Sequence, residues 1–336
     1  MADYLTNTAD LTSVADAIRT KGGTTEQLVY PAGFVSAIQA IQTGVAVQLI
    51  VKTRAGASVT AAKGSTSVSG TADTNGTCTL ALSEAGEWVV TVSKSGDSQS
   101  KTMLIGTQEV ELPMTNAAFA ENTWERIVEV CQAGKVPNTW VVGDSKTMLI
   151  GETEYQVDII GKNHDDLADG SGKAALTLQL HSCYAEKLKF NNTLSSGADT
   201  NAGGWESSLM RTTHLPAILA LMPAEVQSGI REVSKKTTAG SKSRTIVTTT
   251  DKLFLLSEIE ARGRVQWASS EEGTQYDYYE ADSSRRVKTW NGSASAWWLR
   301  SPVLTSTGDI CFVDYDGTSS YYGASNVYGV AFAFCL

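Results

Sequence analysis

The sequence of 336 residues is poor in histidine, proline and charged side chains. Its three histidines are His164, His181 and His214, and none belongs to an HExxH pattern of the kind that binds zinc. Neither a GxGxxG loop nor a P-loop occurs, so these two phosphate-binding motifs are missing. Catalysis is therefore not the first hypothesis, and we expect no enzymatic activity and no cofactor.

The cysteines do not form the pattern of a disulfide scaffold or a zinc finger. There are five of them, an odd number, they are widely spaced, and no CxxC pair occurs. We expect buried free thiols.

The chain also lacks the features of a membrane or nucleic-acid protein. No apolar run approaches the roughly 20 residues that a membrane span needs. The start, residues 1–4, has no basic segment followed by an apolar one, so no export signal is expected. A net charge of −9 makes a nucleic-acid partner unfavourable.

What is abundant is glycine, 29 residues, together with serine and threonine, which favours strands and structured loops. The length indicates two or three domains. We predict an α+β chain with four segments. They are a helical N-terminal attachment element (1–44), an all-β sandwich of Ig-like or prealbumin-like type (45–114), a linker helix (115–139) and a large domain (140–336).

The first two segments differ in the period of their apolar residues. In 1–44, Leu11, Val14 and Ile18 predict one helix face, with Asp10 or Thr12 as its cap, and a second helix begins at Pro31. Its apolar face would be Phe34, Ile38 and Ile41. From Val45 the period is two: Val47, Leu49 and Val51 alternate with Gln48, Ile50 and Lys52, and Trp88, Val90 and Val92 alternate in the same way.

The third segment should be one helix. Asn122 and Glu125 have the spacing of a capping box, and Gly134 and Pro137 should end the helix.

The large domain has predicted strands at 148–150, 156–160 and 175–180 and a helix near 216–222. Trp297 and Trp298 should alternate on a strand, so at least one of them should lie in the core. The neighbouring Arg300 is suited to a bidentate pair with a buried carboxylate, for which Glu258 and Glu260 are both candidates.

Two further loops carry charged groups. Residues 163–166 and 169–172 supply oxygen ligands of the calcium type without EF-hand spacing, so a structural calcium site and a capped surface loop both remain open. The run from Lys235 and Lys236 to Lys242 and Arg244 predicts a basic, solvated hairpin loop.

The last 36 residues, 301–336, contain no Lys, Arg, His, Glu, Gln, Met or Trp, and their only charged residues are Asp309, Asp314 and Asp316. Tyr, Ser, Thr, Asn and Gly dominate up to Tyr328, which is the composition of a binding surface. The run 330–334 is apolar and predicts a buried final strand.

Several stretches together carry a resemblance to a known family. The segment 140–336 resembles a bacterial and phage domain of the C-type-lectin-like (formylglycine-generating-enzyme-like) fold. The matching stretches are Val142-Gly143-Asp144, residues 160–165, Gly203-Gly204-Trp205 with Ser208 and Arg211, residues 251–258, the WWLRSP run 297–302 and the ending 328–336.

The tail resembles the variable region, about 303–328, of diversity-generating-retroelement proteins such as phage tropism determinants. The resemblance implies a reverse transcriptase that randomises adenines, mostly in AAC or AAT codons. Such changes cannot create Lys, Glu, Gln, Met or Trp, all of which are absent after Pro302.

The resemblance also implies roles for single residues. The scaffold would include Trp297, Trp298, Leu299, Arg300, Phe312, Val313, Gly317, Gly329, Val330 and Phe332. The exposed, variable, ligand-binding positions would be Val303, Leu304, Thr305, Ser306, Thr307, Asp309, Asp314, Tyr315, Asp316, Thr318, Ser320, Tyr321, Tyr322, Asn326 and Tyr328.

These features predict a phage or prophage tail-tip receptor-binding protein located in the virion. Its partners would be a host-surface ligand, protein or glycan, and other tail proteins at the N-terminus, which resembles the start of phage tail proteins. A homotrimer is expected, and neither nucleic acid nor membrane is an expected partner. The alternatives are a bacterial adhesin of the same fold and an enzyme of the formylglycine-generating-enzyme-like superfamily, whose oxidase members act through a cysteine pair for which Cys311 and Cys335 are the nearest candidates.

Overall fold

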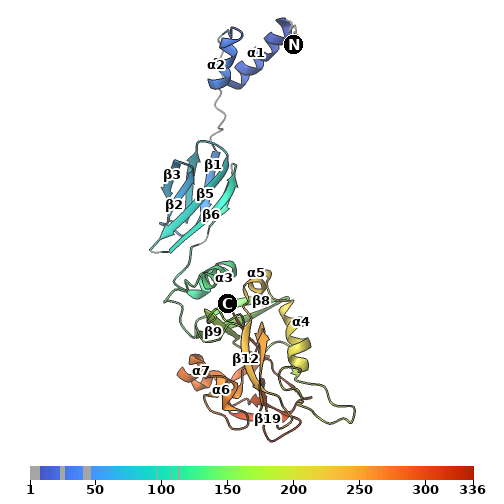
Figure 1. The fold of residues 1–336 in the computed structure, drawn as a ribbon. Helices are drawn as coiled ribbons and strands as arrows, with labels where there is room; N and C mark the ends of the chain where they lie inside the picture. The colour runs from blue at the N-terminus through green and yellow to red at the C-terminus, as the bar shows by residue number, and fades with distance from the viewer. Residues whose placement is uncertain (1–7, 23–26, 41–46, 96, 107, 113) are drawn as a thin grey trace. The chain divides into compact units, whose positions relative to one another are not determined.

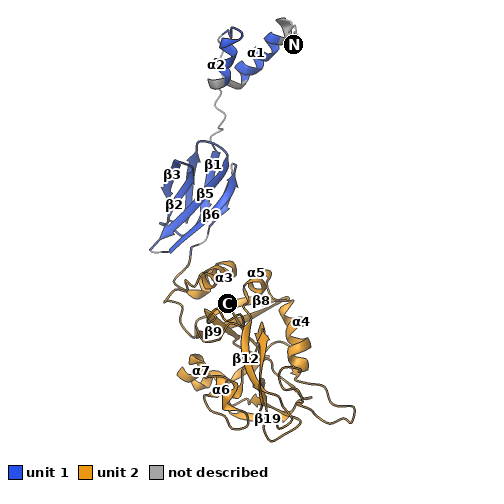
Figure 2. Ribbon diagram, in the orientation of Figure 1, with its two compact units in different colours: residues 1–114 blue, residues 115–336 orange. Residues whose placement is uncertain are grey.

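The computed structural model describes the whole chain except residues 1–7, 23–26, 41–46, 96, 107 and 113. The described residues form two compact units, 1–114 and 115–336, coloured separately in Figure 2. Helices and strands are both abundant (Figure 1), so the chain belongs to the α+β class. None of the helices in the described part of the chain is both long and apolar enough to cross a membrane.

The first unit begins with two helices, α1 (Thr8–Gly22) and α2 (Ala32–Ala40). Ala15, Ile18 and Phe34 are buried and form a small apolar cluster. Ile18 and Phe34 were predicted to lie on the apolar faces, and their burial is confirmed.

Other details of the helix prediction are wrong. Val14 is 49% exposed and Ile38 is 52% exposed, because the contact between the two helices is short and covers only part of each predicted face. Helix α1 begins at Thr8, so Asp10 and Thr12 lie inside it and neither is its cap. The predicted contact residue Ile41 lies outside the described residues.

Two sheets follow, with strand orders β4–β1–β7 and β3–β2–β5–β6. Val47, Leu49 and Val51 of the first sheet share one buried core with Trp88 and other residues of the second, so the sheets pack face to face as a sandwich. The alternation predicted from the sequence is confirmed. The strands are β1 (Val47–Lys52), β2 (Ser58–Lys63), β3 (Thr66–Thr71), β4 (Thr77–Leu82), β5 (Gly86–Lys94), β6 (Asp97–Ile105) and β7 (Gln108–Glu111).

The sequence analysis predicted residues 115–139 as a linker helix between domains. In the structure they belong to the second compact unit. Helix α3 (Trp124–Gln132) buries Ile127, Val130 and other apolar side chains in the core of the second unit. The high amphipathicity of the helix explains this, because its apolar face needs a partner.

The predicted cap of α3 is also wrong. The N-cap is Thr123, whose side chain accepts a hydrogen bond from the Arg126 N–H. The side chain of Asn122 instead binds backbone groups of residues 116–119. The predicted end is confirmed: Gly134 has a φ of +62° and donates its N–H to the carbonyl of Cys131.

The largest sheet of the second unit has five antiparallel strands in the order β14–β21–β10–β9–β8. The predicted strands near 148–150, 156–160 and 175–180 all lie in it. The final strand, which contains Phe334, pairs with Leu178 on one side and Leu253 on the other, and its burial is confirmed. The strands are β8 (Ser145–Ile150), β9 (Thr153–Lys162), β10 (Leu176–Leu180), β14 (Leu253–Phe254) and β21 (Ala333–Cys335).

Smaller sheets and short helices surround this sheet. The sheets pair β11 (Leu188–Lys189) with β20 (Val327–Tyr328), β12 (Val233–Thr238) with β13 (Ile246–Asp251), β15 (Lys288–Trp290) with β16 (Ser293–Ser295), and β17 (Trp297–Pro302) with β18 (Asp309–Val313) and β19 (Ser319–Gly323). The helices are α4 (Leu215–Leu219), which confirms the helix predicted near 216–222, α5 (Ala224–Gly229), α6 (Glu258–Arg262) and α7 (Asp277–Ala281). Shorter helical turns are η1 (Phe119–Glu121), η2 (Met210–His214), η3 (Ser270–Glu272) and η4 (Ser283–Arg286).

Strand β17 is buried along its whole length, and both tryptophans are fully inaccessible. Each indole N–H has a partner: Trp297 donates to the carbonyl of Arg286 at 2.9 Å and Trp298 to that of Leu188 at 2.9 Å. Burial of the predicted scaffold residues Trp297, Trp298, Arg300 and Phe332 is confirmed, since each is 0% exposed.

A chain of buried charges connects β17 to the rest of the unit. Arg300 forms a two-pronged contact with Glu260 of α6, and Glu260 also accepts from Lys235 of β12 at 3.0 Å. Lys235 in turn donates to Asp165, just after β9, and to the hydroxyl of Tyr276 at 3.0 Å. The predicted basic, solvated loop is therefore wrong at its first residue, because Lys235 is only 2% exposed.

We expect Arg300→Met to lower the free energy of unfolding by about 3–5 kcal/mol, because it leaves Glu260 buried without its main cation. Urea denaturation of the purified chain measures this. The matched control is Arg231→Met, which breaks the exposed Arg231–Asp169 pair at 3.0 Å and should cost less than about 1 kcal/mol. Equal losses in the two variants would contradict the importance of the buried pair.

Candidate functional site

The predicted variable positions lie on a loop and a hairpin that follow β17. The loop 303–308 leads into β18, and a turn at 314–318 connects β18 to β19. Tyr315 is 63% exposed, Tyr322 53% and Tyr321 39%. Partial or full exposure is found for fourteen of the fifteen predicted positions, which are Leu304, Thr305, Ser306, Thr307, Asp309, Asp314, Tyr315, Asp316, Thr318, Ser320, Tyr321, Tyr322, Asn326 and Tyr328.

Val303 is the exception, and its prediction as an exposed residue is wrong. It is 1% exposed and belongs to the main core, because it directly follows the buried strand β17 and its N–H still donates to the carbonyl of Asp309 at 3.2 Å. Val327, which was not predicted, is 53% exposed.

The hairpin divides these positions between two surfaces. In the β18–β19 register, Ile310 lies opposite Tyr322, and Cys311 lies opposite Tyr321. Directly paired residues share a face and successive residues alternate between faces. Tyr321 and Tyr322 therefore point to opposite sides of the hairpin, so no single flat face holds both.

Each tyrosine rests on a different aromatic partner. Tyr321 makes an edge-to-face contact with Trp267 at a centroid separation of 4.7 Å. Tyr322 lies 6.4 Å from Tyr328, which stacks on Phe312 at 4.6 Å. We call these sides the Tyr321 surface and the Tyr322 surface. Aromatic pairs of this kind hold the side chains in place while leaving part of each ring accessible.

Several polar residues at the predicted positions are occupied with local hydrogen bonds. The Ser306 hydroxyl donates to Asp309 at 2.7 Å and accepts from the N–H groups of Gly308 and Asp309. Asp316 accepts from the N–H and the hydroxyl of Thr318 at 2.9 and 2.6 Å. These contacts shape the loops, and they leave the tyrosines as the large exposed side chains.

A buried asparagine that the sequence analysis missed holds the 303–309 loop. The Asn201 side-chain amide donates to the carbonyls of Ser306 at 3.0 Å and Asp309 at 2.8 Å, and its oxygen accepts from the N–H of Ser241. Its own N–H donates to the carbonyl of Thr307 at 2.9 Å. Asn201 is 0% exposed, so this one residue links three segments.

The close approach of the 201–204 loop to the β12–β13 hairpin requires glycine at position 204, which belongs to the Gly203-Gly204-Trp205 motif. Gly204 has a φ of +54°, and a Cβ there would lie 2.2 Å from the carbonyl oxygen of Thr238. No other residue fits without moving the β12–β13 hairpin away from the 201–204 loop. In the sequence, the only sign that residues 201–204 hold the 303–309 loop is that residues 191–204 are rich in Asn, Gly and Ser.

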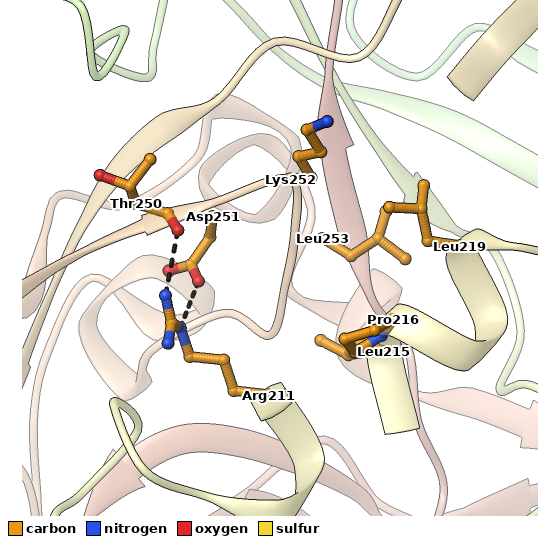
Figure 3. A pocket seen from close by; sticks show the side chains of 8 residues that line it. All are labelled: Arg211, Leu215, Pro216, Leu219, Thr250, Asp251, Lys252 and Leu253. Carbon is orange, nitrogen blue, oxygen red and sulfur yellow. Dashed lines mark hydrogen bonds and ion pairs between the residues drawn. The ribbon is translucent and has the colours of Figure 1, made fainter. Parts of the chain in front are cut away.

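Other motif residues meet at a second place. Asp251 accepts from the indole of Trp205 at 3.0 Å, from Thr249 at 2.6 Å and from Arg211 at 2.5 Å. Figure 3 shows Arg211 also reaching the carbonyl of Thr250, at 3.0 Å, beside a pocket with an apolar wall of Leu215, Pro216, Leu219 and Leu253. Because Asp251 is buried and fully engaged, this constellation fixes β13 against η2 and leaves no free catalytic carboxylate.

Of the two interpretations of residues 163–172, the structure favours the surface loop over a calcium site, because the carboxylates there are paired with cations of the chain. Asp165 pairs with Lys235, Asp166 with Lys173 at 2.8 Å, and Asp169 with Arg231 at 3.0 Å. Although burial alone would raise it, the pKa of Asp165 lies well below its usual range because of the Lys235 charge. Within the residues that the structure describes, no group of three or more His, Cys, Asp or Glu side chains is arranged to bind a metal.

A second pocket near that loop is lined by His164, Lys236, Glu271 and the edge of Glu272. Burial raises the pKa of Glu272 to about 7, against the opposing effect of its hydrogen bond from Ser301. The carboxylate also accepts from the N–H of Thr238 at 3.0 Å. Its hydrogen bonds join β17 to β12, so it serves the scaffold of the site.

The two cysteines of the oxidase alternative do not come together. Cys311 lies on β18 in the three-stranded sheet and Cys335 on β21 in the five-stranded sheet. Both are free and fully buried, as predicted for the cysteines in general. Burial raises the pKa of both thiols well above the ordinary value, which makes them poor nucleophiles at neutral pH.

Comparison with known proteins adds one match. A family model described as a domain of unknown function (DUF6273) matches residues 180–336. No curated protein matches the chain. The matched range contains both hairpin surfaces, Asn201 and the Arg211–Asp251 pair, but it starts at the end of β10 and leaves out β8 and β9. The description of this family names no activity.

We expect Asn201→Ala to lower the free energy of unfolding by about 2–3 kcal/mol, because three side-chain hydrogen bonds are lost at a buried position. Hydrogen exchange of the 303–309 amides should also become faster. The control is Asn326→Ala, which removes a single half-exposed bond to the carbonyl of Gly323 and should cost less than about 1 kcal/mol. Unchanged exchange in the Asn201 variant would contradict its role in holding the loop.

Proposed function

We propose that this chain is a phage or prophage tail-tip receptor-binding protein that acts by binding and not by catalysis. In this proposal, residues 140–336 have a C-type-lectin-like fold whose C-terminal loop and hairpin recognise a ligand on the host surface. The helical element at 1–44 attaches to other tail proteins, and the β-sandwich serves as a spacer. The chain acts in the virion as a homotrimer, so that weak single contacts add up through multivalency.

The observation that carries the proposal is the arrangement of three exposed tyrosines on a hairpin with a rigid base. Tyr315, Tyr321 and Tyr322 are accessible, and the residues between 301 and 336 include no long charged side chain. Tyrosine gives a large contact area at a small entropy cost, which suits it to recognition. The strand next to the hairpin is the fully buried β17, so the backbone beneath the tyrosines is fixed.

The second part of the proposal is that a retroelement diversifies this segment. Its support is the residue set of 301–336, which lacks the five amino acids that adenine changes in AAC or AAT codons cannot produce. The exposed positions fall on loops and on the hairpin, where a changed side chain does not disturb the core. Val303 is excluded from the diversified set because it is buried.

We expect Tyr321→Ala and Tyr322→Ala each to weaken binding to cells of the host strain at least tenfold, because central aromatic residues carry most of the energy of an interface. Thr305→Ala, a small exposed residue of the same segment, should change binding less than threefold. Binding of the purified chain to cells, measured by flow cytometry, tests this. The variants should unfold at the wild-type temperature within a few degrees, and unchanged binding with an intact fold would reject the proposed surface.

We expect the DNA around the coding sequence to contain a near-copy of the segment for residues 300–336, next to a reverse transcriptase gene. The copy should differ from the gene only where the copy has adenines. Sequencing several kilobases on each side decides this. Absence of such a copy would mean a fixed binding surface, and the neighbouring genes would then separate a virion protein from the adhesin alternative.

A further inference from the structure

The pocket beside Arg211 in Figure 3 is lined by residues of η2, α4, the end of β13 and the start of β14. Its volume is about 230 Å³. Sites for drug-sized ligands measure about 300–1,000 Å³, so this pocket suits a smaller molecule. All of its lining residues lie between 211 and 253, and the variable segment therefore takes no part in it.

The backbone of η2 brings two of the lining residues together. Residues Met210–His214 form a π-helix, in which the N–H of Leu215 donates to the carbonyl of Met210, five residues earlier. The π-helix is rare in globular proteins and is frequently found at functional sites. Here Arg211 and Leu215 both line the pocket. The π-helix thus supplies a cation and a residue of the apolar wall.

The polar part of the lining has two cations and one carboxylate. Asp251 is buried, and its two oxygens already accept from Arg211, a threonine hydroxyl and an indole. Lys252 is exposed, and its ammonium has no hydrogen bond or ion pair among the residues that the structure describes. One positive charge of the lining is therefore not compensated, which matches a ligand with one negative charge.

Arg211 retains N–H groups for such a ligand. Its side chain is 25% exposed. Nη1 donates to the carbonyl of Glu206 and Nη2 to that of Thr250, each at 3.0 Å. Each of these nitrogens carries two N–H groups, so one on each has no partner in the described part of the chain. A carboxylate is the anion that the planar guanidinium group binds with two parallel hydrogen bonds.

The other part of the lining is aliphatic. Leu215 and Leu253 are buried, and their side chains form the base of this wall. Leu219 is partly exposed and Pro216 is exposed. Figure 3 shows these four side chains on one side of the pocket and the guanidinium on the other. A wall without an aromatic ring favours an alkyl group over a ligand that binds by ring stacking.

We propose that this pocket binds a short aliphatic carboxylate. The alkyl group lies on the leucines and Pro216, where it leaves water, and the carboxylate binds to Arg211 and Lys252 by charge-assisted hydrogen bonds. This inference goes beyond the proposed function, because it assigns a second binding site that contains no residue of the variable segment.

The test is a titration of the purified full chain with sodium 4-methylpentanoate, followed by saturation-transfer difference NMR on the methyl protons of the probe. Sodium acetate lacks the branched alkyl group, and 4-methylpentanamide lacks the charge. We expect saturable binding of 4-methylpentanoate, with both comparators at least about fivefold weaker. The absence of saturation, or equal binding of either comparator, would overturn the proposal.

The variant Lys252→Gln removes the exposed cation and breaks no hydrogen bond of the fold, so it should raise the Kd of 4-methylpentanoate at least about fivefold. The matched control is Lys242→Gln, which removes an exposed lysine of the β12–β13 turn and should change the Kd less than about twofold. Both variants should unfold at the wild-type temperature within a few degrees. An unchanged Kd in Lys252→Gln, or equal effects of the two variants, would contradict the site.

The apolar wall is tested separately with Leu219→Ala. This variant should raise the Kd at least about threefold, because it removes part of the surface on which the alkyl group lies. Its control is Leu221→Ala, which truncates a leucine that is 50% exposed and lies outside the pocket lining. Equal Kd values for these two variants would show that the alkyl group does not bind to this wall, and the proposal would fail.

Discussion

The position of β17 depends on one carboxylate, that of Glu260, which is buried between two cations. Its oxygens accept from Arg300, from Lys235 and from the N–H of Ser257 at its own helix start, so all of its hydrogen-bonding capacity is used. A buried charge is tolerated only when it is paired in this way. Because the partners come from β12, α6 and β17, the charge network fixes the strand from which the loop and hairpin emerge.

Local contacts hold the other parts of the site in place next to β17. Asn201 holds the 303–309 loop from one side, and Glu258 holds the 263–268 loop and β19 from the other. The polar residues within the variable segment mostly satisfy each other. The large exposed side chains therefore stand on a backbone that does not depend on their identity, which is the physical condition for a surface that changes in sequence while the fold persists.

Local patterns were sufficient to predict the parts of the fold that depend on period and turn chemistry. The alternation at Val47, Leu49 and Val51, the burial of Trp297 and Trp298, and the exposure of most positions after 303 are confirmed. The predictions that failed concern residues whose partners lie far away in the sequence. From the sequence, Asp165 resembled a calcium ligand. In the structure its cation is Lys235, which lies 70 residues later in the chain. Glu258 and Glu260 were equal candidates for Arg300, because only the packing of α6 decides which of two residues on opposite helix sides faces β17.

The division of the hairpin into two surfaces has a consequence for recognition. Residues 303–328 supply tyrosines to both surfaces, whereas Trp267, against which Tyr321 packs, comes from a loop that precedes this segment. Burial raises the pKa of Tyr328, and the nearby charge of Asp314 raises it further, so a negative group lies near the Tyr322 surface. In the proposed function, diversification would change the shape of both surfaces but not the Trp267 ring next to one of them. The aromatic base of the Tyr321 surface would then stay constant, while the choice among ligands would vary with the tyrosines and their neighbours.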